Sequence, residues 1–131
     1  MPPLKHETAR ALRAAALNYP QTAEDFPWQH HAYKVAGKKV FLFMYGAGAG
    51  FTCTMKLPYR HEEALQLKGA SPARYRMAAS GWVTFTFSGK ARPPLAKLLD
   101  WLDESWRAVA PKKLSASVAP PLAPNKRGAA A

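Results

Sequence analysis

A strict alternation of apolar and polar residues runs through residues 51–57 and returns within residues 81–88, from Val83 onward. A period of two places successive side chains on opposite faces of a β-strand, so each segment is expected to be a strand with one buried face. The other face of these strands is expected to stay open, and it carries Thr52, Thr54, Lys56, Thr84 and Thr86. Both segments therefore fit an antiparallel sheet that is covered on one side only.

The cover is expected to come from helices near the two ends of the chain. Residues 95–109 form the clearest helix, because prolines flank them and apolar residues recur at helical spacing. This apolar stripe consists of Leu95, Leu98, Leu99, Leu102, Trp106 and Val109. The charged residues expected to lie away from it are Asp100, Asp103, Glu104 and Arg107. A second amphipathic helix is expected over residues 5–19, and it must stop before Pro20.

The other expected elements are shorter. They are strands at residues 31–36 and 39–45 and a helix at 58–68. Loops are expected at residues 20–30 and 69–80, and the Gly-rich residues 46–50 are expected to form a flexible connection. The sequence thus predicts an α+β domain in the order α-β-β-β-α-β-α, with a single antiparallel sheet and helices packed on one face.

Length and composition indicate one domain followed by a tail. The chain has 131 residues, of which 48% are hydrophobic, and this suffices for one core without cross-links. The domain is assigned to residues 1–113. Residues 114–131 are rich in Pro and Ala and contain no acid, so a disordered basic tail is expected. A lone cysteine and the lack of a signal peptide or long apolar run predict a soluble, cytoplasmic protein without a membrane partner.

The strongest compositional feature is an excess of positive charge. Nineteen Lys and Arg oppose eight Asp and Glu, which gives a formal net charge of +11. Between Glu63 and Asp100 six basic residues occur without a single acid. Such a surface attracts nucleic acid, anionic membrane surfaces or acidic proteins, and it also serves solubility alone. Charge by itself does not choose among these roles.

No residue pattern indicates catalysis or a metal site. His30 and His31 point to opposite sides of an extended chain, and Cys53 falls on the inward strand face. No Cys-x-x-Cys or His-Glu-x-x-His spacing occurs, and residues 46–50 lack the spacing of a phosphate-binding loop. The adjacent Glu24-Asp25 pair is interpreted as a structural anchor. We therefore predict no enzyme, no cofactor and no small-molecule substrate; a deep pocket with convergent polar groups would favour an enzyme instead.

Several segments resemble the MmcQ/YjbR family at matching intervals. They are EDFPW at 24–28, YKVAGK at 33–38, MKLP at 55–58, GWV at 81–83 and SWRAVAPK at 105–112. The resemblance implies a small α/β fold similar to the frataxin-like and secretion-chaperone-like layouts. It also implies DNA binding, with two hairpin wings as the contact surface. The chain departs from the family pattern at Gln29, where Gly is expected, and in the longer Gly-rich residues 46–50, which alter one wing tip.

These observations predict a non-enzymatic protein that binds duplex DNA through phosphate contacts with little sequence specificity. The expected contact residues lie on hairpins and loops, and they are Lys34, Lys38, Lys39, Lys56, Arg74, Arg76, Lys90 and Arg92. The alternative is a protein-interaction module that binds an acidic partner through the open sheet face. Salt-sensitive binding to duplex DNA distinguishes the two.

Overall fold

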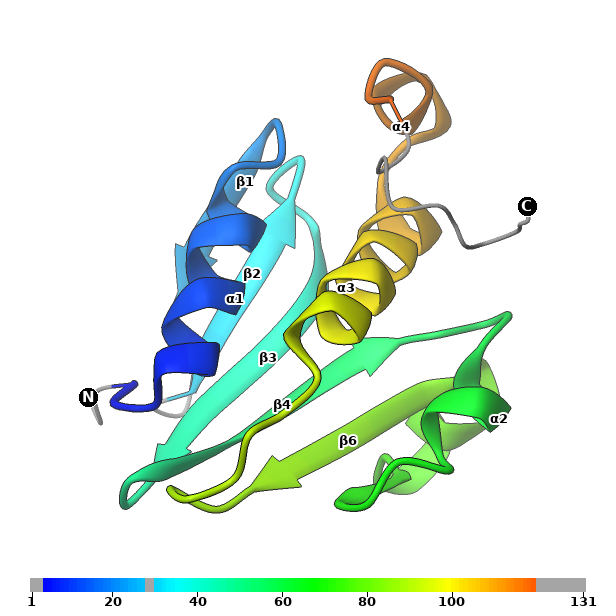
Figure 1. The fold of residues 1–131 in the computed structure, drawn as a ribbon. Helices are drawn as coiled ribbons and strands as arrows, with labels where there is room; N and C mark the ends of the chain where they lie inside the picture. Colours follow the sequence, from blue (N-terminus) through cyan, green and yellow to red (C-terminus); the bar gives the residue numbers. More distant parts are fainter. Residues whose placement is uncertain (1–3, 28–29, 120–131) are drawn as a thin grey trace.

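The computed structural model describes residues 4–27 and 30–119. The strands are β1 (Thr22–Asp25), β2 (His31–Val35), β3 (Lys39–Ala47), β4 (Gly50–Lys56), β5 (Ala70–Pro72) and β6 (Trp82–Phe87). The helices are α1 (Glu7–Leu17), α2 (His61–Ala64), the 3-10 helix η2 (Tyr75–Ser80), α3 (Leu95–Val109) and α4 (Lys112–Ala116). The strands form one antiparallel sheet in the order β1-β2-β3-β4-β6-β5, and α1 and α3 cross one of its faces (Figure 1). The predicted α+β class, with one sheet covered on one face, is confirmed.

Strand β1 lies within residues 20–30, where the sequence predicts a loop. β1 forms one edge of the sheet and pairs with β2, with Glu24 opposite Tyr33. Its four residues, TAED, show no apolar alternation, and all but Thr22 are of types depleted in strands. This segment is therefore a strand because it pairs with β2, and its own residues do not predict a strand.

The segment between β4 and β6 also differs from expectation. The helix expected over residues 58–68 is reduced to the four residues of α2, of which only Ala64 is buried. The expected loop at 69–80 contains the short edge strand β5, which pairs with β6, and the helix η2. Both elements are too short to carry a periodic pattern, so their structure depends on packing against the sheet.

The Gly-rich segment is a tight hairpin rather than a flexible connection. β3 continues to Ala47, which pairs with Gly50 at the start of β4, so only two residues form the turn. Gly48 has a φ of +59°, in the left-handed region that favours glycine. A Cβ on Gly50 would lie 2.2 Å from the carbonyl oxygen of Phe87. Glycine is therefore needed both for the turn and for the close contact with the end of β6.

The core lies between the sheet and helices α1 and α3. Leu98, Leu102 and Trp106 are fully buried, which confirms the centre of the predicted stripe. The stripe is broader than predicted, because Trp101 is also buried and stacks on Phe85 of β6 with ring centroids 5.4 Å apart. Trp101 lies one residue before Leu102, so it widens the apolar face toward the sheet.

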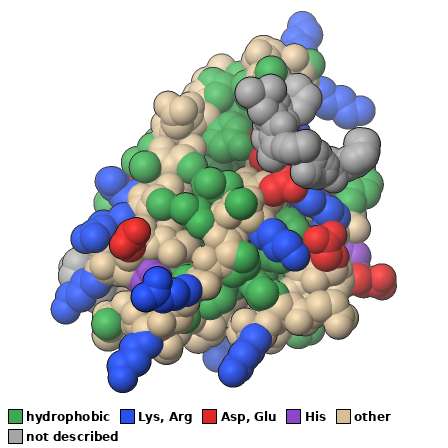
Figure 2. All heavy atoms as spheres, in the orientation of Figure 1, with side chains coloured by type: hydrophobic (Ala, Val, Ile, Leu, Met, Phe, Trp, Pro, Cys, Tyr) green, Lys and Arg blue, Asp and Glu red, His purple; other side chains and the backbone are tan. Residues whose placement is uncertain are grey.

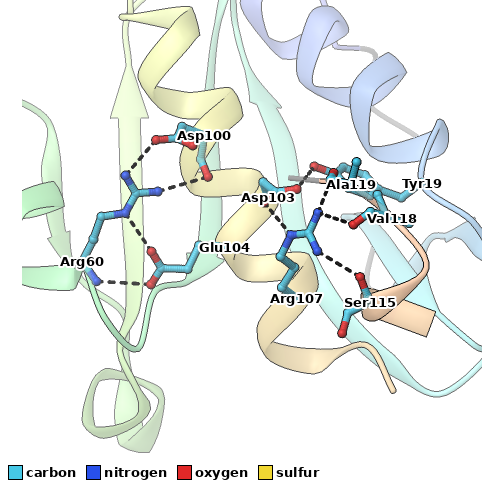
Figure 3. A network of polar contacts seen from close by, with 9 residues as sticks. All are labelled: Tyr19, Arg60, Asp100, Asp103, Glu104, Arg107, Ser115, Val118 and Ala119. Atoms are coloured by element: carbon cyan, nitrogen blue, oxygen red, sulfur yellow. Dashed lines mark hydrogen bonds and ion pairs between the residues drawn. The ribbon is translucent and has the colours of Figure 1, made fainter. Parts of the chain in front are cut away.

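Ordered structure continues past the predicted domain boundary at residue 113. Residues 112–116 form α4, and Leu114 and Val118 pack against the core. The guanidinium of Arg107 donates hydrogen bonds to the main-chain carbonyls of Ser115, Val118 and Ala119, at 3.0, 3.1 and 2.9 Å (Figure 3). The predicted boundary therefore falls inside α4. The remainder of the predicted tail, residues 120–131, lies outside the described residues.

Truncation tests this attachment of the C-terminal segment. We expect a protein ending at residue 113 to be less stable than one ending at residue 119 by about 2 kcal/mol or more, since a hydrogen bond to a charged group has a net contribution of about 1.5–3 kcal/mol and the Arg107 side chain, at 25% exposed, can exchange part of its bonds for water. The apolar contacts of Leu114 and Val118 are lost as well. Urea unfolding of the two proteins measures the difference, and coincident curves would show that Arg107 does not anchor the segment.

Candidate nucleic-acid interface

Most acidic side chains are held in internal ion pairs. The cations in these pairs are Arg13, Lys34, Arg60 and Arg107, and the carboxylates are Glu24, Asp25, Asp100, Asp103 and Glu104. Seventeen of the nineteen Lys and Arg lie in the described ranges, so thirteen of them form no ion pair there. The carboxylates left over are Glu7, Glu62 and Glu63. The charge available to a partner is therefore almost entirely positive.

Arg60 fastens the chain after β4 to helix α3 (Figure 3). Its guanidinium donates to Glu104 Oε1 at 2.9 Å and to Asp100 Oδ2 at 2.8 Å, and Glu104 Oε2 accepts the main-chain N–H of Tyr59 at 2.9 Å. Glu104 and Asp103 are both buried, although the sequence pattern places them away from the apolar stripe. Their burial is possible because ion pairs and hydrogen bonds compensate the lost hydration. Helix α3 thus presents little acidic surface to repel an anion.

Glu24 is the centre of a second internal cluster. Its carboxylate accepts hydrogen bonds from Arg13 at 2.7 and 2.9 Å, from Tyr33 Oη at 2.7 Å and from His31 Nδ1 at 2.9 Å. Desolvation raises the pKa of Glu24, but the hydrogen bonds from these three residues outweigh it and lower the pKa to about 2. Asp25 lies on the opposite face of β1, so the two carboxylates do not converge on one site.

One set of predicted contact residues gathers where β2 turns into β3. Lys38 and Lys39 border a hollow of about 350 Å³ together with Lys112. Lys56 borders a neighbouring hollow of about 660 Å³, which also has Lys112 in its lining. Lys112 is not among the residues predicted from the sequence, because only the fold brings α4 to this hairpin. We name Lys38, Lys39, Lys56 and Lys112 the turn group.

A second set lies at the opposite end of β3. Lys90 and Arg92 precede α3 and border a hollow of about 780 Å³ together with Lys5, beside the tip of the β3–β4 hairpin. His6 Nε2 lies 3.0 Å from the carbonyl oxygen of Ala91 and holds the start of α1 against this loop. We name Lys5, Lys90 and Arg92 the tip group. The nine residues of β3 separate the two groups by about 30 Å, at about 3.4 Å per residue.

The other predicted contact residues belong to neither group. Arg74 and Arg76 are exposed around η2. Lys34 is paired with Asp25 at 2.9 Å, which reduces its value as a phosphate contact. The structure therefore distributes the eight predicted residues over several places. On the helix-covered side, Lys and Arg lie mostly in separate groups toward the rim, with apolar atoms between them (Figure 2).

The open face of the sheet contains a further hollow of about 700 Å³, which we name the open-face hollow. Its floor consists of the cross-strand pairs Thr52–Thr86 and Thr54–Thr84 of β4 and β6. Tyr45 lines one side and stacks on His30 with ring centroids 4.5 Å apart. Arg74 and Met77 line another side. The alternation of the strands predicts the threonine floor, whereas the two sides come from segments far apart in the sequence.

In residues 4–27 and 30–119 no three His, Cys, Asp or Glu side chains are grouped as a metal ion would require. Within the same ranges, no helix has the length and apolar character to cross a bilayer. Cys53 is fully buried on the helix-covered face of β4, and desolvation raises the pKa of its thiol.

Comparison with known proteins identifies the family. A family model described as YjbR matches residues 17–108, and the chain belongs to the YjbR family. The crystal structure of a Deinococcus radiodurans protein with a DUF419 domain is similar, with a TM-score of 0.67 and 22% sequence identity over 90% of this chain and 91% of that chain. At that identity the likeness shows a shared fold. No curated protein matches the chain in sequence. The resemblance to the MmcQ/YjbR family is thus confirmed.

Proposed function

We propose that this YjbR-family protein binds duplex DNA without catalysis, through phosphate contacts of the turn group and the tip group. The observation that carries the proposal is the charge balance: internal pairing occupies five of eight carboxylates, while thirteen described cations form no ion pair. A duplex carries one negative charge per about 1.7 Å of its axis, so it is strongly attracted to such a surface. The proposed location is the cytoplasm, where the single thiol of Cys53 suits a reducing environment.

The spacing of the two groups supports a duplex as the partner. The groups are about 30 Å apart along β3, and one turn of B-DNA measures about 34 Å. Phosphates one turn apart face the same side of the duplex, so both groups can contact the backbone at once. Base reading requires an element in a groove, and the helix that carries a residue of the turn group, α4, is only five residues long. Little sequence specificity is expected as a result.

An acidic protein partner is the second candidate. The open-face hollow and the partly exposed Tyr45 offer a docking surface, and the net charge of +11 suits an acidic protein. This candidate places the contacts on the uncovered face of the sheet, whereas the DNA proposal places them at the two ends of β3. Substitutions at those ends therefore separate the two candidates.

Charge reversal of each group is expected to weaken duplex binding by about tenfold or more, because each triple variant removes and reverses three phosphate contacts. The turn variant is Lys38→Glu, Lys39→Glu and Lys112→Glu, and the tip variant is Lys5→Glu, Lys90→Glu and Arg92→Glu. A matched control with the same net charge is Arg10→Glu, Lys68→Glu and Lys97→Glu. Fluorescence anisotropy with a labelled duplex of about 20 base pairs measures affinity. An equal loss in all three variants would show that net charge alone attracts DNA.

A further inference from the structure

The proposed duplex contacts do not use the open-face hollow. Its volume of about 700 Å³ falls within the range of about 300–1,000 Å³ that is usual for ligand sites. The lining includes apolar and aromatic side chains, among them Phe43, Tyr45 and Met77, and polar ones, among them the threonine floor and Arg74. A ligand that matches this lining has a flat apolar body, a polar edge and a negative charge.

Tyr45 provides a surface on which a flat ring can stack. Its ring is nearly parallel to that of His30, with an interplanar angle of 15°, and 36% of Tyr45 remains exposed. Tyr45 lies within β3, opposite Thr52 of β4, so the sheet fixes its position. Stacking of a nucleobase on an aromatic side chain contributes about 1–3 kcal/mol. The exposed part of the ring therefore offers a surface on which a base can stack.

The threonine floor supplies uncharged hydrogen-bonding groups next to this platform. A hydroxyl has one proton to donate and two lone pairs to accept with. The oxygens of Thr54 and Thr84 are 3.0 Å apart, so one hydroxyl of the pair donates to the other. Thr52 donates to Thr86 in the same way, at 3.5 Å. Each pair thus retains one proton and free lone pairs, which match the mixed donors and acceptors on the edge of a base.

Arg74 supplies the positive charge of the hollow. Its side chain is exposed and forms no ion pair among the described residues. A guanidinium can bind two phosphate oxygens through parallel hydrogen bonds. Because Arg74 and Tyr45 line the same hollow, one ligand can place a ring against Tyr45 and a phosphate against Arg74. A nucleotide has both groups.

We propose that the open-face hollow binds an unpaired nucleotide of single-stranded DNA, with its base on Tyr45 and its phosphate at Arg74. A base inside a duplex is stacked and paired, so it cannot enter the hollow. The site is separate from the turn and tip groups. The inference therefore goes beyond the proposed function and does not depend on the outcome of the duplex experiment.

Aromatic substitutions test the site directly. Affinity for a labelled oligothymidylate of about ten nucleotides is measured by fluorescence anisotropy at about 0.15 M salt. We expect Tyr45→Ala to weaken binding roughly 5- to 150-fold, the equivalent of one lost stacking contact. Tyr45→Phe keeps the ring and should stay within about twofold of wild type. The matched control is Tyr59→Ala, because Tyr59 is 87% exposed and lies outside the lining of the hollow.

Arg74→Ala gives a second readout that a purely apolar site would not show. It should weaken binding because one phosphate contact is lost. The slope of log affinity against log salt should then become less steep by about 0.7, the value for one contact with a single strand. The free mononucleotide is measured beside the oligonucleotide. Equal affinities for the two would overturn the assignment of a strand as the ligand, and weaker binding of the mononucleotide supports it.

Three other results would overturn the proposal: no binding of single strands by wild type, equal affinity in wild type and folded Tyr45→Ala, or an equal loss in Tyr59→Ala. Thermal unfolding of each variant shows that it is folded. The same proteins are measured with duplex DNA, for which Tyr45→Ala should match wild type. Failure of duplex binding with retained single-strand binding would refute the proposed function alone, so the two failures are distinguishable.

Discussion

Trp106→Ala is expected to lower the free energy of unfolding by about 3–5 kcal/mol, as for other large aromatic side chains in protein cores. Trp106 is fully buried and stacks on Tyr19 of the segment after α1, with ring centroids 4.8 Å apart. Tyr19 in turn donates a hydrogen bond to Asp103 at 2.6 Å. This bond holds Tyr19 in place, so it cannot move fully into the space that alanine would leave.

Urea unfolding followed by circular dichroism measures this effect without relying on tryptophan fluorescence. The matched control is Leu95→Ala, on the exposed first turn of the same helix, which should cost about 1 kcal/mol or less. Equal effects of the two substitutions would mean that α3 does not face the sheet as described. The predicted stripe includes Leu95, but this side chain is 36% exposed, so the buried stripe begins at Leu98.

Acid is expected to destabilise the protein through Glu24. The pKa of this carboxyl is about 2 in the folded protein, compared with an ordinary value of 4.5. A lowered pKa stabilises the folded state above about pH 4.5, and this contribution is lost as the pH falls toward about 2. The difference corresponds to about 3 kcal/mol. Solvent screening is limited, because the side chain of Glu24 is only 11% exposed.

The measurement compares wild type with Glu24→Gln at a series of pH values. At pH 6 the variant should be less stable by about 3 kcal/mol, and the two proteins should converge near pH 2. Glu62→Gln serves as a control, since Glu62 is exposed and belongs to no ion pair within the described ranges. If stability differences between wild type and Glu24→Gln were constant over this range, the cluster around Glu24 would not set its pKa.

Local periodicity predicts the parts of the fold that carry it. Alternation within β4 and β6 and helical spacing within α3 are properties of single segments, so each identifies its element before any contact is known. Strands β1 and β5 lack such a pattern. They are strands because they pair with β2 and β6, and this pairing cannot be inferred from their own residues. The burial of Asp103 and Glu104 was not predictable from α3 either. It depends on partners from other segments: Arg60 pairs with Glu104, and Tyr19 donates a hydrogen bond to Asp103, which also pairs with Arg107 of the same helix.

For the candidate sites, too, the sequence predicts some features and the fold determines the others. Composition indicates an anionic partner, and alternation predicts the threonines on the open face. Which cations lie close together depends on the fold. Lys112 lies near the β2–β3 turn because α4 packs there, and Lys5 lies near Lys90 because α1 begins beside the loop between β6 and α3. Tyr45 and Arg74 likewise line one hollow only because the fold brings their segments together. Sequence alone therefore indicated the charge of the partner and left the geometry of its contacts open.

Duplex binding at several salt concentrations tests the central claim most directly. The turn and tip groups together contain seven cations, so the slope of log affinity against log salt should be about −6 for a duplex of about 20 base pairs. A duplex of about 8 base pairs is shorter than one turn and reaches one group at a time, so its slope should fall to about half. Equal slopes for the two lengths, or no binding to either at low salt, would contradict the two-group interface.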